Sequence, residues 1–172
     1  MRTFMELARD RYSVRKFDGR KIEKEKLDKI IEAGQIAPTG ANLQPQRIYI
    51  LQSEDALAKL KELKCTTFGA GMVLLFAYDS MPELIPEEKR VNLGVEDVSI
   101  VATHMMLEAW ELGIGTCWTN GFSAAQIKEA FFLPENEEVV LLMPIGYPVP
   151  DAQPLTRWHD TFKPIDEVVT YL

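Results

Sequence analysis

The sequence predicts a β-sheet flanked by helices, of the α+β or α/β class. Four apolar runs have the length of strands, and segments of helical periodicity alternate with them along the chain. A hydrophobic fraction of 47% and a charged fraction of 26% in 172 residues are typical of a soluble globular domain with its own core. We therefore expect a single domain over residues 1–172.

The first part of the chain predicts two helices separated by an extended segment. Residues 2–9 indicate a short helix, and residues 11–17 indicate an extended chain. Over residues 22–38, apolar side chains recur at the i, i+3, i+4 and i+7 spacing of an amphipathic helix. Pro38 ends that helix.

The middle of the chain predicts two buried strands with a helix between them. The turn-rich loop PTGANLQP leads into a strand over 46–53, whose four consecutive apolar residues predict burial on both faces. Ser53 is the candidate N-cap of a helix that follows. A second buried strand is expected over 71–78, and a Pro- and Glu-rich connection over 79–90.

The last third predicts a long helix, two strands and an arm. A mostly buried helix over 91–113 is expected to stop at Gly113, before a strand over 114–119. Ser123 and Gln126 form a capping box for the next helix, and a strand over 137–148 follows it.

The arm begins at Val149 and has several prolines and little helical period. It has too few apolar residues to pack alone. We therefore expect it to lie across another surface, such as that of a partner subunit.

Composition and charge exclude several classes of function. A formal net charge of -7 argues against nucleic acid as a general partner. The apolar runs are too short to span a bilayer, and the charged N-terminus does not resemble a signal peptide, so we expect a cytoplasmic protein. We expect Cys65 and Cys117 to be reduced, buried thiols.

No metal site is predicted. His104 and Glu108 have i, i+4 spacing, but His159 stands alone in the arm, and two side chains do not make a site. His104 is expected to be a hydrogen-bonded interior or interface residue.

The segment RYSVRKF concentrates cations in an acidic chain. In an extended chain, Arg11, Ser13 and Arg15 share one face, while Tyr12 and Val14 face the core. Two guanidinium groups and a hydroxyl suit a phosphate monoester, because arginine donors match its oxygens bidentately. A solvated surface stretch is the alternative interpretation.

Two further segments have the chemistry to bind a heteroaromatic ring. In APTGANLQPQ, the amides of Asn42 and Gln44 can both donate and accept hydrogen bonds, as a ring edge of alternating carbonyl and N–H groups requires. In TCWTNGF, a strand ends at a turn just before a helix N-terminus, where backbone N–H groups are exposed. Each segment could also be an ordinary connection.

The order of these segments resembles the nitroreductase family of FMN-dependent NAD(P)H oxidoreductases. RYSVRKF, APTGANLQPQ, ELGIGTCWTNGF, MPIGYP and KPIDEVVTYL follow one another along nearly the whole chain. The resemblance implies an α+β fold with a central mixed β-sheet flanked by helices, and an extended C-terminal arm crossing to the partner subunit. It also implies a homodimer that binds FMN at the subunit interface and uses NADH or NADPH as reductant.

The resemblance assigns the flavin-binding residues in four groups. Arg11, Ser13 and Arg15 would hold the phosphate and ribityl end and could reach the pyrimidine edge. Lys163 would complete the phosphate site, with Arg157 as an alternative. A second group would approach the flavin from the other subunit: Pro38, Thr39, Gly40, Asn42 and Gln44. A third would lie against the ring: Trp118, Thr119, Asn120 and Gly121. A backbone N–H of Asn120 or Gly121 would address flavin N5.

The implied activity is ping-pong hydride transfer through flavin N5 to a nitroaromatic or quinone-like oxidant, and no catalytic protein acid or base is assigned. The chain departs from the family pattern at Thr39-Gly40, where two serines are common, and at Gln46, where tryptophan is common. A flavin-binding storage or sensing protein, a flavin-free interaction domain and a reductive dehalogenase of the same fold are alternatives. The sequence does not distinguish NADH from NADPH, nor does it identify the physiological oxidant.

Overall fold

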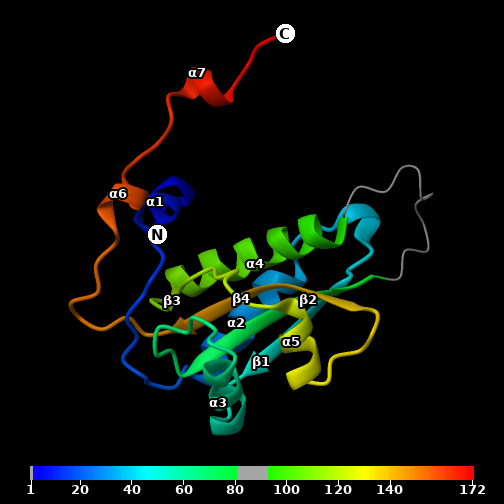
Figure 1. Cartoon of the computed structure of the whole chain (residues 1–172). Coiled ribbons are helices and arrows are strands. Elements are labelled where there is room, and N and C mark those ends of the chain that lie inside the picture. The colour runs from blue at the N-terminus through cyan, green and yellow to red at the C-terminus, as the bar shows by residue number, and fades with distance from the viewer. Residues whose placement is uncertain (1, 81–92) are drawn as a thin grey trace.

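The computed structural model describes residues 2–80 and 93–172 (Figure 1). Its helices are α1 Phe4–Asp10, α2 Lys24–Gln35, α3 Glu54–Glu62, α4 Leu93–Glu111, α5 Ala124–Ala130, α6 Thr156–His159 and α7 Ile165–Val168, with a 3₁₀ turn, η1, at Gly40–Asn42. Its strands are β1 Gln46–Leu51, β2 Met72–Asp79, β3 Gly115–Thr116 and β4 Glu137–Gly146. One sheet whose named strands pair antiparallel, flanked by helices, confirms the α+β class.

The four strands form one sheet in the order β1-β2-β4-β3. The three pairings between neighbouring strands are antiparallel. A parallel element occurs at the isolated bridge between Ser13 and Thr116, where the N-terminal extended segment runs beside β3. The mixed character expected of the sheet therefore rests on this bridge and not on the named strands.

Helices cover both faces of the sheet. Alternate residues of β2 point to opposite faces, so that Leu74 and Phe76 belong to one core cluster and Val73 and Leu75 to the other. Helices α2 and α4 cover the first face, and α3 and α5 cover the second (Figure 1). The unbroken apolar run of β2 is thereby explained, because a strand between two helix layers buries both sets of side chains.

The helix ends predicted at Ser53, Ser123 and Gly113 are confirmed, and of the capping box expected at Ser123 and Gln126 the structure shows the half that the Ser123 side chain makes. The Ser53 side chain accepts a hydrogen bond from the backbone of Ala56, and Ser123 accepts one from the backbone of Gln126. Gly113 has a φ of 76° immediately after α4, a conformation that glycine adopts without steric strain. These residues fix where three of the helices begin or end.

Helices α2 and α4 approach each other closely at Gly34. A Cβ atom at this position would lie 2.7 Å from the Met105 sulfur. Glycine at this point of the α2 apolar face therefore sets the distance between the two helices that cover the first face of the sheet.

Two predictions about strands are wrong. Strand β1 is not buried on both faces, since only Leu51 of its six residues is buried; β1 lies at the edge of the sheet, with only β2 beside it. The strand predicted over 114–119 is reduced to Gly115–Thr116, after which the chain meets β4 again through a bridge between Thr119 and Leu142. The predicted connection over 79–90 lies almost entirely outside the described residues.

The C-terminal arm forms two single-turn helices, α6 and α7, although the sequence shows little helical period there. Beyond α6 the arm extends away from the sheet and its helices (Figure 1). Its apolar side chains are largely uncovered: Phe162 is 82% exposed, Ile165 73% and Tyr171 94%.

Both cysteines are buried and free, as expected. In the part of the chain that the structure describes, no helix combines the length and the apolar character needed to cross a membrane.

Candidate functional site

The N-terminal extended segment is fixed against the end of the sheet. The backbone N–H of Val14 donates to the carbonyl of Thr116 at 2.9 Å, and Phe17 forms a bridge with Pro148. Val14 is fully buried, and a Cβ atom at Gly115 would lie 2.5 Å from its side chain. Since Val14 points into the core, its neighbours Ser13 and Arg15 point to the opposite side, as an extended chain requires.

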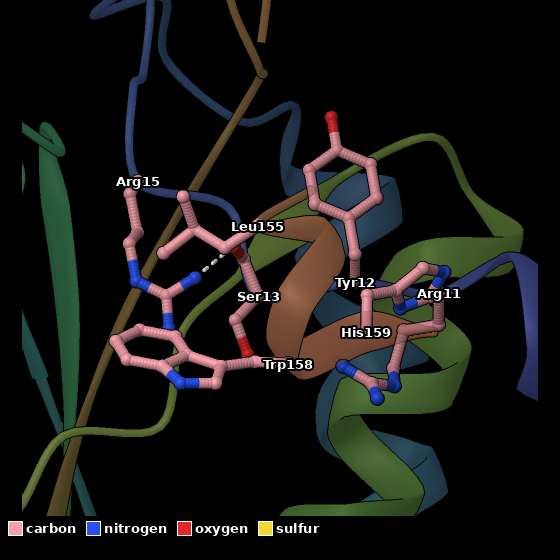
Figure 2. A pocket seen from close by; sticks show the side chains of 7 residues that line it. All are labelled: Arg11, Tyr12, Ser13, Arg15, Leu155, Trp158 and His159. Atoms are coloured by element: carbon pink, nitrogen blue, oxygen red, sulfur yellow. Dashed lines mark hydrogen bonds between the residues drawn. The ribbon is translucent and has the colours of Figure 1, made fainter. Parts of the chain in front are cut away.

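A small pocket joins this segment to the beginning of the C-terminal arm (Figure 2). Its lining residues come from the extended segment and from α6 and the residue before it: Arg11, Tyr12, Ser13, Arg15, Leu155, Trp158 and His159. The structure thus brings together the three residues that the sequence grouped as an anion site.

Tyr12 does not face the core as predicted. It lines the pocket, and its ring lies edge-on to Trp110 with ring centroids 5.1 Å apart. Its hydroxyl donates to the carbonyl of Ala152 at 3.1 Å. The reason is that the extended segment crosses the C-terminal end of α4, where an aromatic ring can pack on the helix and still reach the arm.

Arg15 is held by its own segment and by aromatic rings. Its Nη1 donates to the carbonyl of Ser13 at 3.0 Å. Its guanidinium lies 5.3 Å from the ring centroid of Trp158 and 5.9 Å from that of Phe68, within the range of cation–π attraction. Arg157 lies 4.7 Å from the same Trp158 ring, so two guanidinium groups contact one indole.

The electrostatics of the pocket favour an anion. Burial lowers the pKa of the Arg11 guanidinium, because the cation is partly removed from water. Burial also raises the pKa of the Cys117 thiol, although Arg15, a hydrogen bond with Ser13 and Arg11 oppose that rise. The buried thiol of Cys117 therefore lies close to the arginines, and a bound anion would replace the solvation that Arg11 has lost.

The second segment, residues 38–44, is a tightly constrained loop. Ala41, Asn42 and Gln44 all have positive φ, of 47°, 56° and 50°. The Thr39 hydroxyl accepts the backbone N–H of Gln44 at 3.1 Å, and the carboxylate of Asp97 accepts that of Gly40 at 2.7 Å. Non-glycine residues in this region store strain that the surroundings must hold in place.

The loop and the pocket lie at opposite ends of α4. Asp97 contacts the loop near the start of the helix, and Trp110 contacts Tyr12 near its end. Trp110 follows Asp97 by thirteen residues of the same helix, which corresponds to about 20 Å at 1.5 Å per residue. Within one chain, the structure does not bring Asn42 or Gln44 to the pocket.

The segment TCWTNGF, residues 116–122, continues directly from β3 and lies beside the N-terminal extended segment. Both the backbone N–H and the hydroxyl of Thr119 donate to the carbonyl of Leu142, at 2.9 Å each. Trp118 packs against the core beneath α4, while Asn120 and Gly121 are exposed. The turn therefore lies at the surface, next to the N-terminus of α5.

The structure places Lys163 on the exposed arm between α6 and α7, and not among the pocket-lining residues.

The sequence reasoning missed the contributions of Trp158, His159 and Cys117. No local signal marks Trp158 and His159, because the arm carries other apolar and aromatic side chains, among them Phe162 and Tyr171, that do not line the pocket. The hydrogen bond between His104 Nδ1 and the carbonyl of Ile100, at 2.9 Å, confirms that His104 is hydrogen-bonded.

Comparisons with known proteins agree on one family. The sequence profile of the nitroreductase family matches residues 8–68 and 60–147. The structure of a nitroreductase family protein from Clostridium difficile 630 is 37% identical, covers 98% of each chain and superimposes with a TM-score of 0.89. A protein of Methanothermobacter thermautotrophicus, named a putative NADH dehydrogenase/NAD(P)H nitroreductase, is 28% identical over 93% of this chain and 83% of its own.

A third likeness concerns the fold alone. A putative nitroreductase from Exiguobacterium sibiricum, solved in complex with FMN, is 24% identical, covers 100% of this chain and 98% of its own, and has a TM-score of 0.85.

Proposed function

The chain belongs to the nitroreductase family, and from this premise we propose that it is an FMN-dependent NAD(P)H oxidoreductase that works as a homodimer with shared flavin sites. The observation that carries the proposal is the pocket that Arg11, Ser13 and Arg15 line together in a chain of net charge -7. A flavin mononucleotide has one doubly negative group, and this pocket supplies two guanidinium groups and a hydroxyl for it.

The residues present fit FMN in three respects. The partly desolvated cation of Arg11 and the hydroxyl of Ser13 suit the phosphate end. The exposed turn at Asn120 and Gly121 offers backbone N–H donors for a ring nitrogen, and Trp118 and Thr119 would lie against the same ring. The constrained loop of Pro38, Thr39 and Gly40 presents the amides of Asn42 and Gln44 for the ring edge.

The distance between the loop over 38–44 and the pocket supports a dimer. The loop over 38–44 lies about 20 Å along α4 from the pocket of its own chain. A second copy of the chain could bring its own loop to that pocket, so that each flavin would be held by residues of two subunits. The uncovered apolar side chains of Phe162, Ile165 and Tyr171 would then be buried where the arm crosses to the partner.

When bound, FMN would supply the redox chemistry, accepting hydride at N5 from NADH or NADPH and passing it to a small aromatic or quinone-like oxidant in ping-pong order. The protein would bind and orient. Arg11 and Arg15 would neutralise the phosphate, the Asn120–Gly121 turn would fix the ring by a backbone N–H, and the resemblance would add Lys163 or Arg157 as a further cation at the phosphate. No protein side chain need donate or accept a proton, and the names of the relatives, which include NAD(P)H nitroreductases, support this class of reaction.

Cofactor analysis of the purified protein tests the proposal. We expect a yellow dimer that holds one FMN per chain, measured by absorbance after denaturation and by light scattering. A colourless protein that binds no added FMN would instead favour an interaction domain with a decayed site. A yellow protein that NAD(P)H does not reduce would favour storage or sensing, and release of halide from a halogenated aromatic would favour reductive dehalogenation.

A further inference from the structure

The pocket contains an imidazole to which the family resemblance gives no role. His159, at the end of α6, lines the pocket with Arg11, Ser13 and Arg15 (Figure 2). Its side chain is 24% exposed, and its ring lies edge-on to Tyr12 with centroids 6.3 Å apart. Either ring nitrogen of an imidazole can serve in a hydrogen bond, so the wall of the pocket holds a polar group beyond the arginines and the serine.

The position of His159 is fixed, although most of the arm is exposed. Its backbone N–H donates to the carbonyl of Leu155 at 2.9 Å, which closes the single turn of α6. The arm is attached to the body of the protein at two points, ahead of the turn by the hydroxyl of Tyr12 donating to Ala152 and within the turn by the ring of Trp158 against Arg15. A group held in this way can recognise a ligand without first being ordered.

The charges around His159 also suit an anion. Arg11 and Arg15 share the pocket with it. The acidic side chain near it is Asp160, whose Oδ1 lies 4.0 Å from Nε2 at the limit of an ion pair and whose side chain is 65% exposed. An exposed carboxylate at this distance is strongly screened by water, so the pocket keeps its positive character.

We propose that His159 donates a hydrogen bond to the phosphate of FMN, beside Arg11 and Ser13, and thereby makes this chain prefer FMN to riboflavin. The inference rests on the proposed function, since it takes FMN as the ligand. It gives His159 the part at the phosphate that the resemblance assigned to Lys163, which is exposed four residues further along the arm. Riboflavin lacks the phosphate, so the contribution of His159 is expected for FMN and absent for riboflavin.

Flavin titrations of the full-length chain test this preference. The protein is freed of flavin by dialysis, and the dissociation constants of FMN and riboflavin are measured by fluorescence for the wild type, His159→Gln, Lys163→Gln and His104→Gln. We expect His159→Gln to weaken FMN binding about tenfold, the equivalent of one charge-assisted hydrogen bond, and to leave riboflavin binding within about twofold. His104→Gln makes the same substitution at the chain's other histidine and is expected to change neither constant.

Because the chain has two histidines, nuclear magnetic resonance gives an independent readout on the unaltered protein. FMN, but not riboflavin, is expected to shift the imidazole signals of His159 and to leave those of His104 in place. This readout does not depend on whether a variant folds.

Three results would overturn the inference. An equal loss of FMN and riboflavin affinity in His159→Gln would show that the residue only supports the fold of the pocket. Unchanged FMN binding in His159→Gln, with a tenfold loss in Lys163→Gln, would return the role to the lysine. In both cases the wild type still binds FMN and the proposed function stands, whereas a wild type that binds no flavin would remove both.

Discussion

The constrained loop over 38–44 depends on one buried carboxylate. Asp97 is 2% exposed, and its Oδ1 accepts the backbone N–H of Gly40 at 2.7 Å. Its second oxygen has no hydrogen-bond partner among the described residues. We expect Asp97→Ala to release the loop while the sheet and its helices stay folded.

The size of this effect follows from two opposing terms. A hydrogen bond to a charged group contributes about 1.5–3 kcal/mol. The left-handed conformations of Ala41, Asn42 and Gln44 each cost about 1 kcal/mol, which gives about 3 kcal/mol of strain in the loop. Losing about 1.5–3 kcal/mol of bonding should raise the open population of the loop by roughly tenfold to 150-fold. The strain, which the bond no longer offsets, then favours the open loop.

The free energy of unfolding of the whole chain should change less than the free energy of opening the loop. Asp97→Ala also removes a buried carboxylate oxygen that lacks a partner, and leaving such a group unpaired is itself unfavourable. The two effects oppose each other in the free energy of unfolding. They do not oppose each other in the loop, where only the bond to Gly40 is lost.

Hydrogen exchange of the Gly40 amide measures the effect directly, and Asp97→Asn is the matched control. The asparagine keeps an oxygen that can accept from Gly40, and neutral hydrogen bonds are about half as strong, so on a logarithmic scale it should lose about half as much protection as Asp97→Ala does. Urea unfolding checks that both variants are folded. Unchanged protection of Gly40 in Asp97→Ala would refute this explanation of the loop.

The arginines, the arm and the thiols each give a further prediction. Arg15→Ala should weaken FMN binding by roughly tenfold to 150-fold in a fluorescence titration, whereas Lys16→Ala, on the exposed neighbouring side chain, should not; equal effects would remove the specific role of Arg15. Deleting residues 161–172 should convert a dimer to a monomer in light scattering, and a dimer of the same stability would show that the arm is not part of the interface. Burial raises the pKa of Cys65 and Cys117, so both hold less thiolate at pH 7 than a free cysteine and should react with iodoacetamide slowly and faster as the pH rises; labelling of the folded protein at the rate of free cysteine would contradict their burial.

Local signals predicted most of the elements. The serines that cap α3 and α5 and the glycine after α4 are chemical requirements of helix ends, and they are visible in the sequence. The burial of β1 could not be predicted in the same way. A run of apolar residues looks alike in a central strand and an edge strand, and only the order of the strands in the sheet decides between them.

The candidate site was predictable where its residues are close in sequence. Arg11, Ser13 and Arg15 share a face because of the two-residue period of an extended chain, which needs no knowledge of the fold. Trp158 and His159 reach the same pocket through contacts between segments more than 140 residues apart, for which the sequence has no local signal. The distance between the pocket and the 38–44 loop likewise depends on the length and placement of α4.

The most direct test of the proposed function is an anaerobic titration of the purified dimer with NADH and with NADPH, followed by a quinone. We predict that one equivalent of one or both nucleotides per flavin removes the oxidised flavin absorbance, and that the quinone restores it. Absorbance that neither nucleotide changes, in a protein that holds FMN, would contradict the assignment of this chain as an NAD(P)H oxidoreductase.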